Sequence, residues 1–282
     1  MIQVVVGIVC FLVAQFAMNY LQFLLHLDET RLPLALRLGV PTGISAVVSL
    51  IVSRVVIARA RGDELGFSSR HVRELPIGFL LGALLISLVM AVLLISGAWS
   101  FDSTVPTAPV RELVASFIGF ALVGLGEEIL FRGVFFKAFE EWLGTAGALA
   151  ITSLFFGVAH LMNPNSSLLA AVAIAIEAGL LLGAAFLVSR SLWLPIGLHW
   201  AWNFTLGSVF GAPVSGQILP SLLHGHSNGL LFLNGGTWGP EAGLAAFVLC
   251  TACGIALLLR ARSRTEWIPL RKPAPEPAQL PG

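Results

Sequence analysis

Charged residues are scarce in this sequence. Only 11% of its 282 residues are Asp, Glu, Lys or Arg, whereas 57% are hydrophobic. An average soluble domain contains about a quarter charged residues, and a soluble fold of this length has too little interior to bury so much apolar surface. The composition therefore excludes an ordinary soluble domain and requires that part of the surface faces lipid. The formal net charge of +1 also provides no basic field for a nucleic-acid partner.

Cysteine is rare as well, with three residues in the chain. All three lie in apolar runs, where Cys usually acts as a small buried hydrophobe. Cys250 and Cys253 have the spacing of a redox pair, but such a pair normally follows a strand of a soluble fold. We therefore expect no redox role for them.

Basic residues are missing before the first apolar run. A secretory signal peptide carries basic residues at its start and small residues at a cleavage site. The first 16 residues, MIQVVVGIVCFLVAQF, contain no Lys or Arg. We therefore expect this stretch to be a retained first helix.

What the sequence has in excess is apolar runs of membrane-spanning length. A spanning helix needs about 20 mostly apolar residues, and these runs are continuous rather than alternating, which favours helices over a barrel. Eight spans are predicted, at residues 2–25, 39–58, 76–98, 112–132, 146–162, 168–188, 191–210 and 241–259. The predicted fold is an all-α polytopic membrane protein with one transmembrane domain, residues 1–267. The Pro-rich tail, residues 268–282, is predicted to be disordered.

Most basic residues lie in every second connection between the predicted spans, which places them at the same end of the bundle. The connections at one end of an eight-span bundle carry 12 of the 16 Lys and Arg residues: Arg54, Arg59, Arg61, Arg70, Arg73, Lys137, Arg190, Arg260, Arg262, Arg264, Arg271 and Lys272. Lys and Arg are enriched in cytoplasmic connections. Both termini of this multi-pass protein are therefore predicted to be cytoplasmic.

The fourth span contains Gly126-Glu127-Glu128-Ile129-Leu130-Phe131-Arg132, with apolar sequence on both sides. A charged side chain at the bilayer centre costs at least about 2.5–3.5 kcal/mol, so a chain that keeps several of them usually uses them. Glu128 and Arg132 are four residues apart and share a helix face, which predicts an ion pair with a structural role. Glu127 is five residues from Arg132 and is predicted to face a cavity.

A histidine in the fifth span is predicted to meet Glu127. His160 follows Phe156 by four residues and precedes Pro164, which is expected to end the helix. The fourth and fifth spans form a predicted hairpin that turns near Gly144, which is 17 residues after Glu127 and 16 before His160. At equal rise per residue, Glu127 and His160 lie at similar depth.

Two further sets of polar residues lie in later spans. His199 and Asn203 are four residues apart in the seventh span, so both side chains point the same way. Glu177 has no basic residue three or four positions away. It is expected either to be protonated or to find a partner on another helix, with Arg132, His160 and His199 as the candidates.

Glu127, His160, His199 and Asn203 supply each role that metal-free hydrolysis of a peptide bond requires. A carboxylate in an apolar cavity is a competent general base near neutral pH. A His beside it can orient the same water molecule and later donate a proton to the leaving amine. The imidazole N–H of His199 and the amide of Asn203 can stabilise the oxyanion.

These segments resemble the EExxxR, FxxxH and HxxxN motifs of the type II CAAX prenyl endopeptidases, the CPBP intramembrane proteases. In this chain the motifs are Glu127-Glu128-x3-Arg132, Phe156-x3-His160 and His199-x3-Asn203. All three occur in order and in separate predicted spans, and the resemblance covers about residues 115–205.

The resemblance implies a glutamic intramembrane protease with an active-site cavity among its helices. Glu127 and His160 would be the water-activating pair, and His199 and Asn203 the oxyanion site. Supporting rather than catalytic roles are assigned to Glu128, Arg132, Phe156 and Glu177. The implied substrate is a peptide or lipidated protein in the bilayer, including a prenylated CAAX-type protein, and no cofactor is implied.

Two other function classes stay open. A zinc-dependent protease would use Glu127, His160 and His199 as ligands, although the HExxH helix of many such enzymes is absent. A non-catalytic membrane scaffold, an immunity protein or a small transporter would also retain buried ionisable residues. The transporter version predicts an internal repeat, which the sequence does not have. Aspartyl chemistry is disfavoured because no Asp lies within a predicted span.

The segment 211–240 is Gly-rich and contains no Asp, Glu, Lys or Arg. It is predicted to form a cap on the non-cytoplasmic side, with a partly re-entrant path as the alternative. His224 and His226 within it are expected to be solvated rather than metal-bound.

Overall fold

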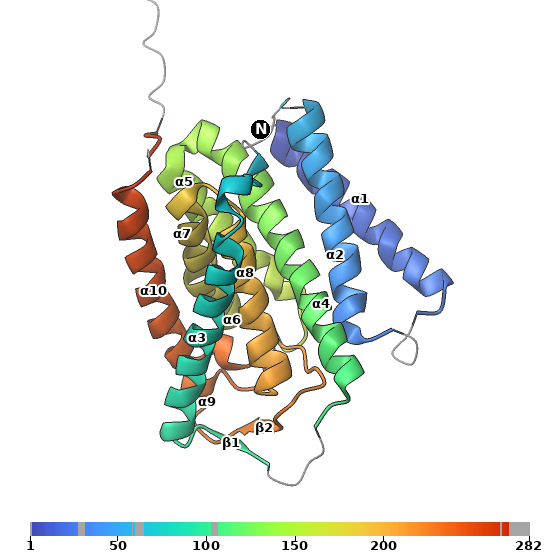
Figure 1. Ribbon diagram of the computed structural model, residues 1–282, viewed down its shortest axis with the longest axis vertical. Coiled ribbons are helices and arrows are strands. Elements are labelled where there is room, and N and C mark those ends of the chain that lie inside the picture. The colour runs from blue at the N-terminus through green and yellow to red at the C-terminus, as the bar shows by residue number, and fades with distance from the viewer. Residues whose placement is uncertain are drawn as a thin grey trace, which may run out of the picture.

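A computed structural model of the protein describes residues 2–27, 32–57, 59, 65–102, 107–265 and 267–270. It is a bundle of helices that run up and down along one axis (Figure 1). The long elements are α1 (Ile2–Leu24), α2 (Leu34–Leu50), α3 (Glu74–Ile95), α4 (Val110–Glu128), α5 (Lys137–Ala159), α6 (Leu168–Ile174), α7 (Leu180–Ser189), α8 (Trp193–Asn203) and α10 (Leu244–Arg262). The short elements are α9 (Leu231–Asn234) and the antiparallel strands β1 (Trp99–Phe101) and β2 (Gly225–Ser227).

Four of these helices continue as wider π-helical segments. Ile51–Ile57 extends α2, Ile129–Phe136 joins α4 to α5, Ala175–Gly179 joins α6 to α7, and Phe204–Val209 extends α8. Such segments are rare and often occur at functional sites. Two of them begin directly after residues of the predicted site, Glu128 and Asn203.

The number of membrane-spanning helices agrees with the prediction from the sequence. Among the described residues, six continuous helices are long and apolar enough to cross a membrane, and the longest, Val110–Met162, has 53 residues. That helix bends at Gly144, where φ is 71° and ψ is 175°, so it forms the two arms of the predicted hairpin. Counting the arms separately and adding the shorter α8 with its extension gives the predicted eight.

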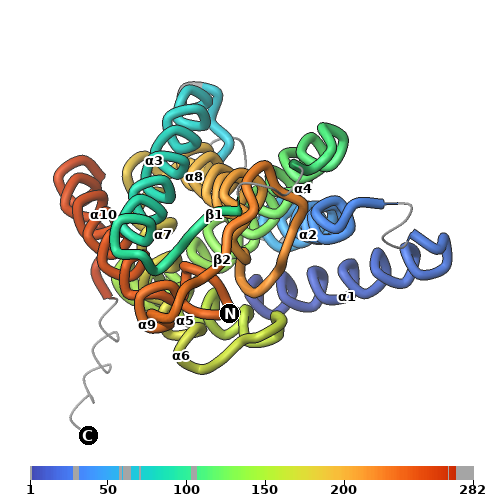
Figure 2. The backbone as a smooth tube through the Cα atoms, turned by 90° about the horizontal axis from the view of Figure 1, so that it is seen from below, coloured from blue at the N-terminus to red at the C-terminus, as the bar shows by residue number. Residues whose placement is uncertain are grey.

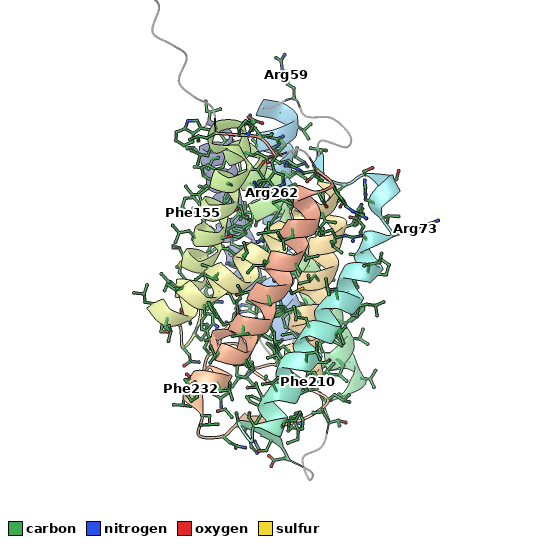
Figure 3. The ribbon with its side chains drawn as sticks, turned by 90° about the vertical axis from the view of Figure 1, so that its left-hand side faces the viewer. Arg59, Arg73, Phe155, Phe210, Phe232 and Arg262 are labelled. Carbon is green, nitrogen blue, oxygen red and sulfur yellow. The ribbon has the colours of Figure 1, made fainter. Side chains whose placement is uncertain are left out.

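Positive charge collects at one end of the bundle. The start of α1 and the end of α10 lie at the same end (Figure 1). Figure 3 places Arg59, Arg73 and Arg262 at that end and Phe210 and Phe232 at the opposite end. This asymmetry is the one predicted from the sequence. The assignment of the Arg-rich end to the cytoplasm stays a prediction from the positive-inside rule.

The first residues of the predicted tail are among the described residues. Thr145 N–H donates to the Ile268 carbonyl oxygen at 2.9 Å, and Ile268 N–H donates to Thr145 Oγ1 at 2.9 Å. Ile268, the first residue of the predicted tail, is therefore bound to the turn of the hairpin. Residues 271–282 of the predicted tail lie outside the described residues.

Glycines bring α8, which carries His199 and Asn203, into close contact with α3. A Cβ at Gly197 would overlap the Leu75 carbonyl oxygen, and one at Gly82 would overlap the carbonyl oxygen of Leu198. Membrane helices associate through such small residues, because lipid provides no hydrophobic drive between them. The backbone contact therefore fixes the depth and rotation of α8.

Adding one methyl group to this interface is expected to destabilise the protein. We expect Gly197→Ala to lower the free energy of unfolding in mixed micelles by about 1–3 kcal/mol, because the added Cβ forces two backbones apart. Gly43→Ala in α2 is the matched control, since its Cβ would meet its nearest neighbour at an ordinary 3.5 Å. Equal stability of the two variants would contradict this account of the packing.

Candidate active site

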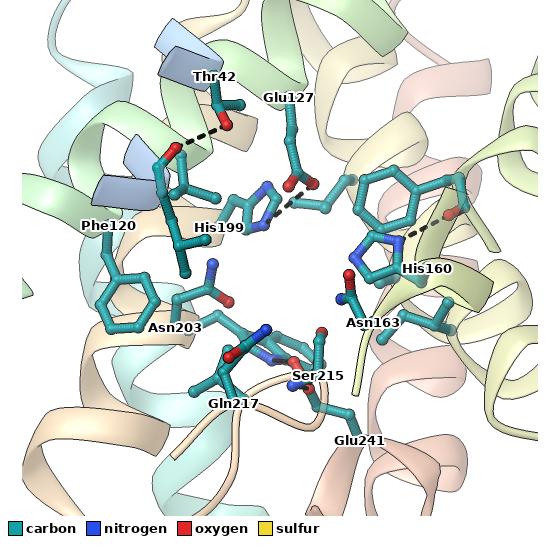
Figure 4. A pocket seen from close by; sticks show the side chains of 18 of the residues that line it. Thr42, Phe120, Glu127, His160, Asn163, His199, Asn203, Ser215, Gln217 and Glu241 are labelled. Carbon is teal, nitrogen blue, oxygen red and sulfur yellow. Dashed lines mark hydrogen bonds and ion pairs between the residues drawn. The ribbon is translucent and has the colours of Figure 1, made fainter. Parts of the chain in front are cut away.

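A cavity of about 190 Å³ lies between α4, α5, α6 and α8. It is closed by residues from the segment 214–219 and by Glu241 (Figure 4). Its polar lining consists of Thr42, Glu127, His160, Asn163, His199, Asn203, Ser215, Gln217 and Glu241. All four residues that the sequence predicted to be catalytic are in this set, and they come from three different helices.

Glu127 and Glu128 face different surroundings although they are neighbours at the end of α4. The side chain of Glu127 is 22% exposed and lines the cavity, whereas that of Glu128 is fully buried. Glu127 Oε2 accepts no hydrogen bond from the described residues and lies 3.9 Å from His199 Nε2. That distance is too long for a direct hydrogen bond. Glu127 thus lines the cavity, as helix spacing predicted, and its buried Oε2 accepts no hydrogen bond from the described residues.

Glu128 joins two helices through a buried network. Arg132 Nη1 donates to Glu128 Oε1 at 2.9 Å, which is the predicted ion pair, and Arg132 Nη2 donates to the Gly179 carbonyl oxygen at 3.0 Å. His199 Nδ1 lies 2.9 Å from the same Glu128 oxygen. The sequence interpretation treated Glu128 and Arg132 as a self-contained pair and missed this third member. Glu128 also orients His199.

The contact with Glu128 determines which nitrogen of His199 faces the cavity. A carboxylate beside Arg132 is an acceptor, so His199 Nδ1 carries a proton and donates it. His199 Nε2 then points towards Glu127 (Figure 4). Asn203 lies one helical turn further along α8, and its carboxamide lines the same cavity.

His160 is oriented by the backbone of its own helix. Its Nδ1 donates to the Phe156 carbonyl oxygen at 2.7 Å, so Nε2 is left for the cavity. The Phe156 ring lies 4.7 Å from the His160 ring and 6.0 Å from the His199 ring, between centroids. The Arg132 guanidinium lies 5.0 Å from the centroid of the Phe156 ring. Phe156 therefore packs against both histidines and connects them to the buried cation.

Sequence reasoning missed a second buried carboxylate, Glu241. Trp202 Nε1 donates to Glu241 Oε1 at 2.8 Å, and Ser215 donates to Oε2 from both its backbone N–H and its hydroxyl group. Burial raises the pKa of Glu241, whereas the donors from Ser215 and Trp202 and the nearby His160 act in the opposite direction. In the sequence, Glu241 is the first residue of the last predicted span and was not among the predicted site residues. Its place as an acidic residue at the edge of an apolar run was the one available signal.

Glu177 lies outside the cavity. It is fully buried, and neither carboxylate oxygen accepts a hydrogen bond from the described residues. None of the three candidate partners predicted from the sequence, Arg132, His160 and His199, donates a hydrogen bond to Glu177. Arg132 instead donates to the backbone of Gly179, two residues further along. The protonated form, which the sequence left as the other possibility, is the form that suits a buried carboxyl group with no partner.

The potential metal ligands are dispersed. Within the described ranges, no three His, Cys, Asp or Glu side chains form a group that could hold one metal ion. Glu127, His160 and His199 line one cavity, but His199 Nδ1 is bound to Glu128. In the loop, His226 Nε2 lies 3.3 Å from Asp102 Oδ1, with both side chains about half exposed.

Residues 225–229, Gly-His-Ser-Asn-Gly, have the G-x-S-x-G spacing of a serine hydrolase nucleophile. Ser227 and His226 are successive residues of β2, paired with Trp99 and Ser100 of β1. Successive strand residues point to opposite faces, so His226 and its partner Asp102 are turned away from Ser227. The spacing therefore does not assemble a catalytic triad here.

The segment 211–240 crosses the end of the bundle opposite the Arg-rich end, together with β1 and α9 (Figure 2). Val214, Ser215, Gln217 and Leu219 reach the cavity lining. The segment therefore caps the bundle and also forms part of the site.

Comparison with known proteins agrees with the motif resemblance. No curated protein matches the chain. Residues 109–205 match the family model described as Type II CAAX prenyl endopeptidase Rce1-like. This range includes α4 to α8 and all three motifs. Over residues 109–205, the chain is therefore similar to the Rce1-like family of type II CAAX prenyl endopeptidases.

Proposed function

We propose that this protein is an intramembrane endopeptidase that hydrolyses membrane-associated substrates with a water molecule activated by Glu127 and His160. The observation that carries this proposal is the meeting of four residues from three helices at one cavity, where Glu127 keeps an uncommitted oxygen. A structural ion pair needs no such cavity. General base catalysis needs an unpaired carboxylate within reach of a water molecule.

In the first step, Glu127 takes a proton from water while the water oxygen attacks the carbonyl carbon of the scissile peptide bond. His160 holds the same water through Nε2, which is available because Nδ1 is bound to the Phe156 carbonyl oxygen. The cavity around this water is also lined by the apolar side chains of Phe120, Phe156 and Leu198.

The attack moves negative charge to the former carbonyl oxygen, which His199 and Asn203 stabilise. With Nδ1 donating to Glu128, His199 donates from Nε2 only as the imidazolium form. The carboxylates of Glu127 and Glu128 flank the ring and favour that form. Asn203 contributes its amide N–H. Preorganised donors of this kind are worth about 10²–10³ in rate for each donor.

The tetrahedral species then breaks its C–N bond. The leaving amine takes the proton that Glu127 received from water, directly or through His160, and the new carboxyl group keeps the water oxygen. Atoms and charges balance without a redox partner. We propose no resident metal or cofactor.

The substrate proposed is a lipidated, CAAX-type membrane peptide. The family description supports this class. A second groove of about 600 Å³, almost wholly apolar, lies along α5 and α6, the helices on either side of the His160 turn. Its lining includes Leu149, Leu154, Val158, Leu168, Val172 and Leu180. An isoprenoid chain has the same apolar chemistry.

The test is cleavage of an internally quenched S-farnesyl peptide, ending in Cys-aliphatic-aliphatic-Met, by purified protein in phosphatidylcholine vesicles. Native protein is expected to release a C-terminal tripeptide, identified by mass spectrometry, and to keep its rate in a strong chelator. Loss of activity in chelator with rescue by zinc would overturn the metal-free mechanism. Full activity of His160→Ala would overturn the assignment of the water-activating pair.

A further inference from the structure

The cavity wall opposite Glu127 is a tight turn, Val214–Gln217. Val214 N–H donates to the Gln217 carbonyl oxygen at 2.9 Å, and Gln217 N–H donates to the Val214 carbonyl oxygen at 2.8 Å. Figure 4 shows Glu127 at one end of the cavity and Ser215, Gln217 and Glu241 at the other. A peptide whose scissile bond lies at Glu127 therefore has this turn as its neighbour.

The turn is held rigidly from three sides. Glu241, 2% exposed, accepts both the backbone N–H and the hydroxyl group of Ser215. Gly216 N–H donates to the Trp238 carbonyl oxygen at 2.9 Å. Gly216 has φ of 81°, and a Cβ there would overlap the Pro164 carbonyl oxygen, so the turn packs against the α5–α6 connection. Glu241 thus acts as a positioning residue for a preformed surface.

Two side-chain carboxamides project from this region into the cavity. Gln217 belongs to the turn, and Asn163 belongs to the connection that Gly216 packs against. Figure 4 shows both side chains directed at the cavity. Neither carboxamide is hydrogen-bonded to another group in the described part of the chain. Each offers donors and an acceptor side by side, the complement of a peptide group.

The wall presents no free charge to a bound molecule. The one carboxylate in it, Glu241, is occupied by the donors of Trp202 and Ser215. A charged headgroup or a terminal carboxylate would meet no counter-charge there, whereas the N–H and C=O groups of a peptide backbone would each find a partner. Sequence-independent recognition of the main chain suits a protease.

We propose that Gln217 and Asn163 form a subsite that binds the main-chain amides of the substrate beside the scissile bond. This inference rests on the proposed function, because it assumes a peptide in the cavity. Hydrogen bonds to the backbone exist equally in the ground state and the transition state, so their loss raises KM and leaves kcat nearly unchanged.

The test combines enzyme variants with backbone-ester analogues of the S-farnesyl peptide. Each analogue replaces one amide N–H by oxygen, and the scissile bond is left intact. Gln217→Ala is expected to raise KM about 5–10-fold with kcat within about twofold. With native protein, an ester at one position of the peptide is expected to raise KM by a similar factor. With Gln217→Ala, the same ester is expected to cause no further increase in KM, because the hydrogen bond is already lost. Asn163→Ala is expected to couple in the same way to a different position.

Asn228→Ala is the matched control. Asn228 is a carboxamide in the same 211–240 segment, but it donates to Ser100 Oγ outside the cavity. Its KM is expected to equal that of native protein with every analogue. Thermal unfolding in detergent micelles checks that all variants remain folded.

The outcomes separate this inference from the proposed function. If the peptide is cleaved but the increases in KM from the ester and from Gln217→Ala multiply at every ester position, the two groups do not interact. That result would overturn the subsite and leave the proposed protease function standing. The subsite is also overturned if only amidation of the peptide's terminal carboxylate couples to Gln217. If native protein cleaves nothing, fluorescence anisotropy measures binding of the peptide. If the peptide binds and Gln217→Ala weakens the binding, the subsite stands and the protease function is overturned. If the peptide does not bind, both proposals are overturned.

Discussion

Glu127→Gln is expected to lower kcat by about 10²- to 10⁴-fold while the protein stays folded. The carboxamide has nearly the same shape as the carboxylate but cannot take a proton from water. Glu127 Oε2 accepts no hydrogen bond from the described residues, so replacing this oxygen breaks no hydrogen bond that stabilises the described fold. The rate is measured with the S-farnesyl peptide in vesicles, and folding by thermal unfolding.

Glu112→Gln is the matched control for this prediction. Glu112 lies in the first turn of the same helix and pairs with Arg111 at 2.9 Å near the bundle surface. Its kcat is expected to equal that of native protein. If Glu127→Gln retains more than about a tenth of the native kcat, Glu127 is not the general base.

Arg132→Met is expected to lower the free energy of unfolding by about 3–5 kcal/mol, because it leaves the carboxylate of Glu128 buried without its cation. Both side chains of this pair are at most 1% exposed. Unfolding in mixed micelles measures the loss. Arg111→Ala, which breaks an ion pair whose Arg side chain is 79% exposed, is the control and is expected to cost less than about 1 kcal/mol.

The double variant Glu128→Leu/Arg132→Met separates the structural role of the pair from its role in the site. It leaves no unpaired buried charge, so much of the stability is expected to return. Its kcat is expected to stay low, because His199 Nδ1 loses the acceptor that orients the ring. A double variant with native stability and native kcat would show that Glu128 does not position His199.

Contacts within one helix or one hairpin could be predicted from the sequence. The Glu128–Arg132 pair follows from a spacing of four residues, and the common cavity of Glu127 and His160 follows from their nearly equal distances to the turn at Gly144. Both predictions need only the rise and repeat of a helix. The ionisable residues could be singled out because they lie in apolar runs of membrane-spanning length, where charged side chains are rare.

Contacts between distant elements could not be predicted in this way. The bond between Glu128 and His199 depends on how α4 and α8 pack, which is determined by backbone contacts at glycines such as Gly197. Glu241 enters the site because an irregular turn folds back into the bundle and places Ser215 against it. No periodic pattern encodes the path of such a turn.

The central claim is that Glu127 and His160 together hydrolyse peptides in the membrane. The most direct measurement is mass spectrometry of membrane peptides from cells that express native protein, Glu127→Gln or His160→Ala at equal levels. The same uncut peptides are expected to accumulate in both variants, with their cleaved forms present only with native protein. Identical peptide profiles in all three cells would contradict the claim.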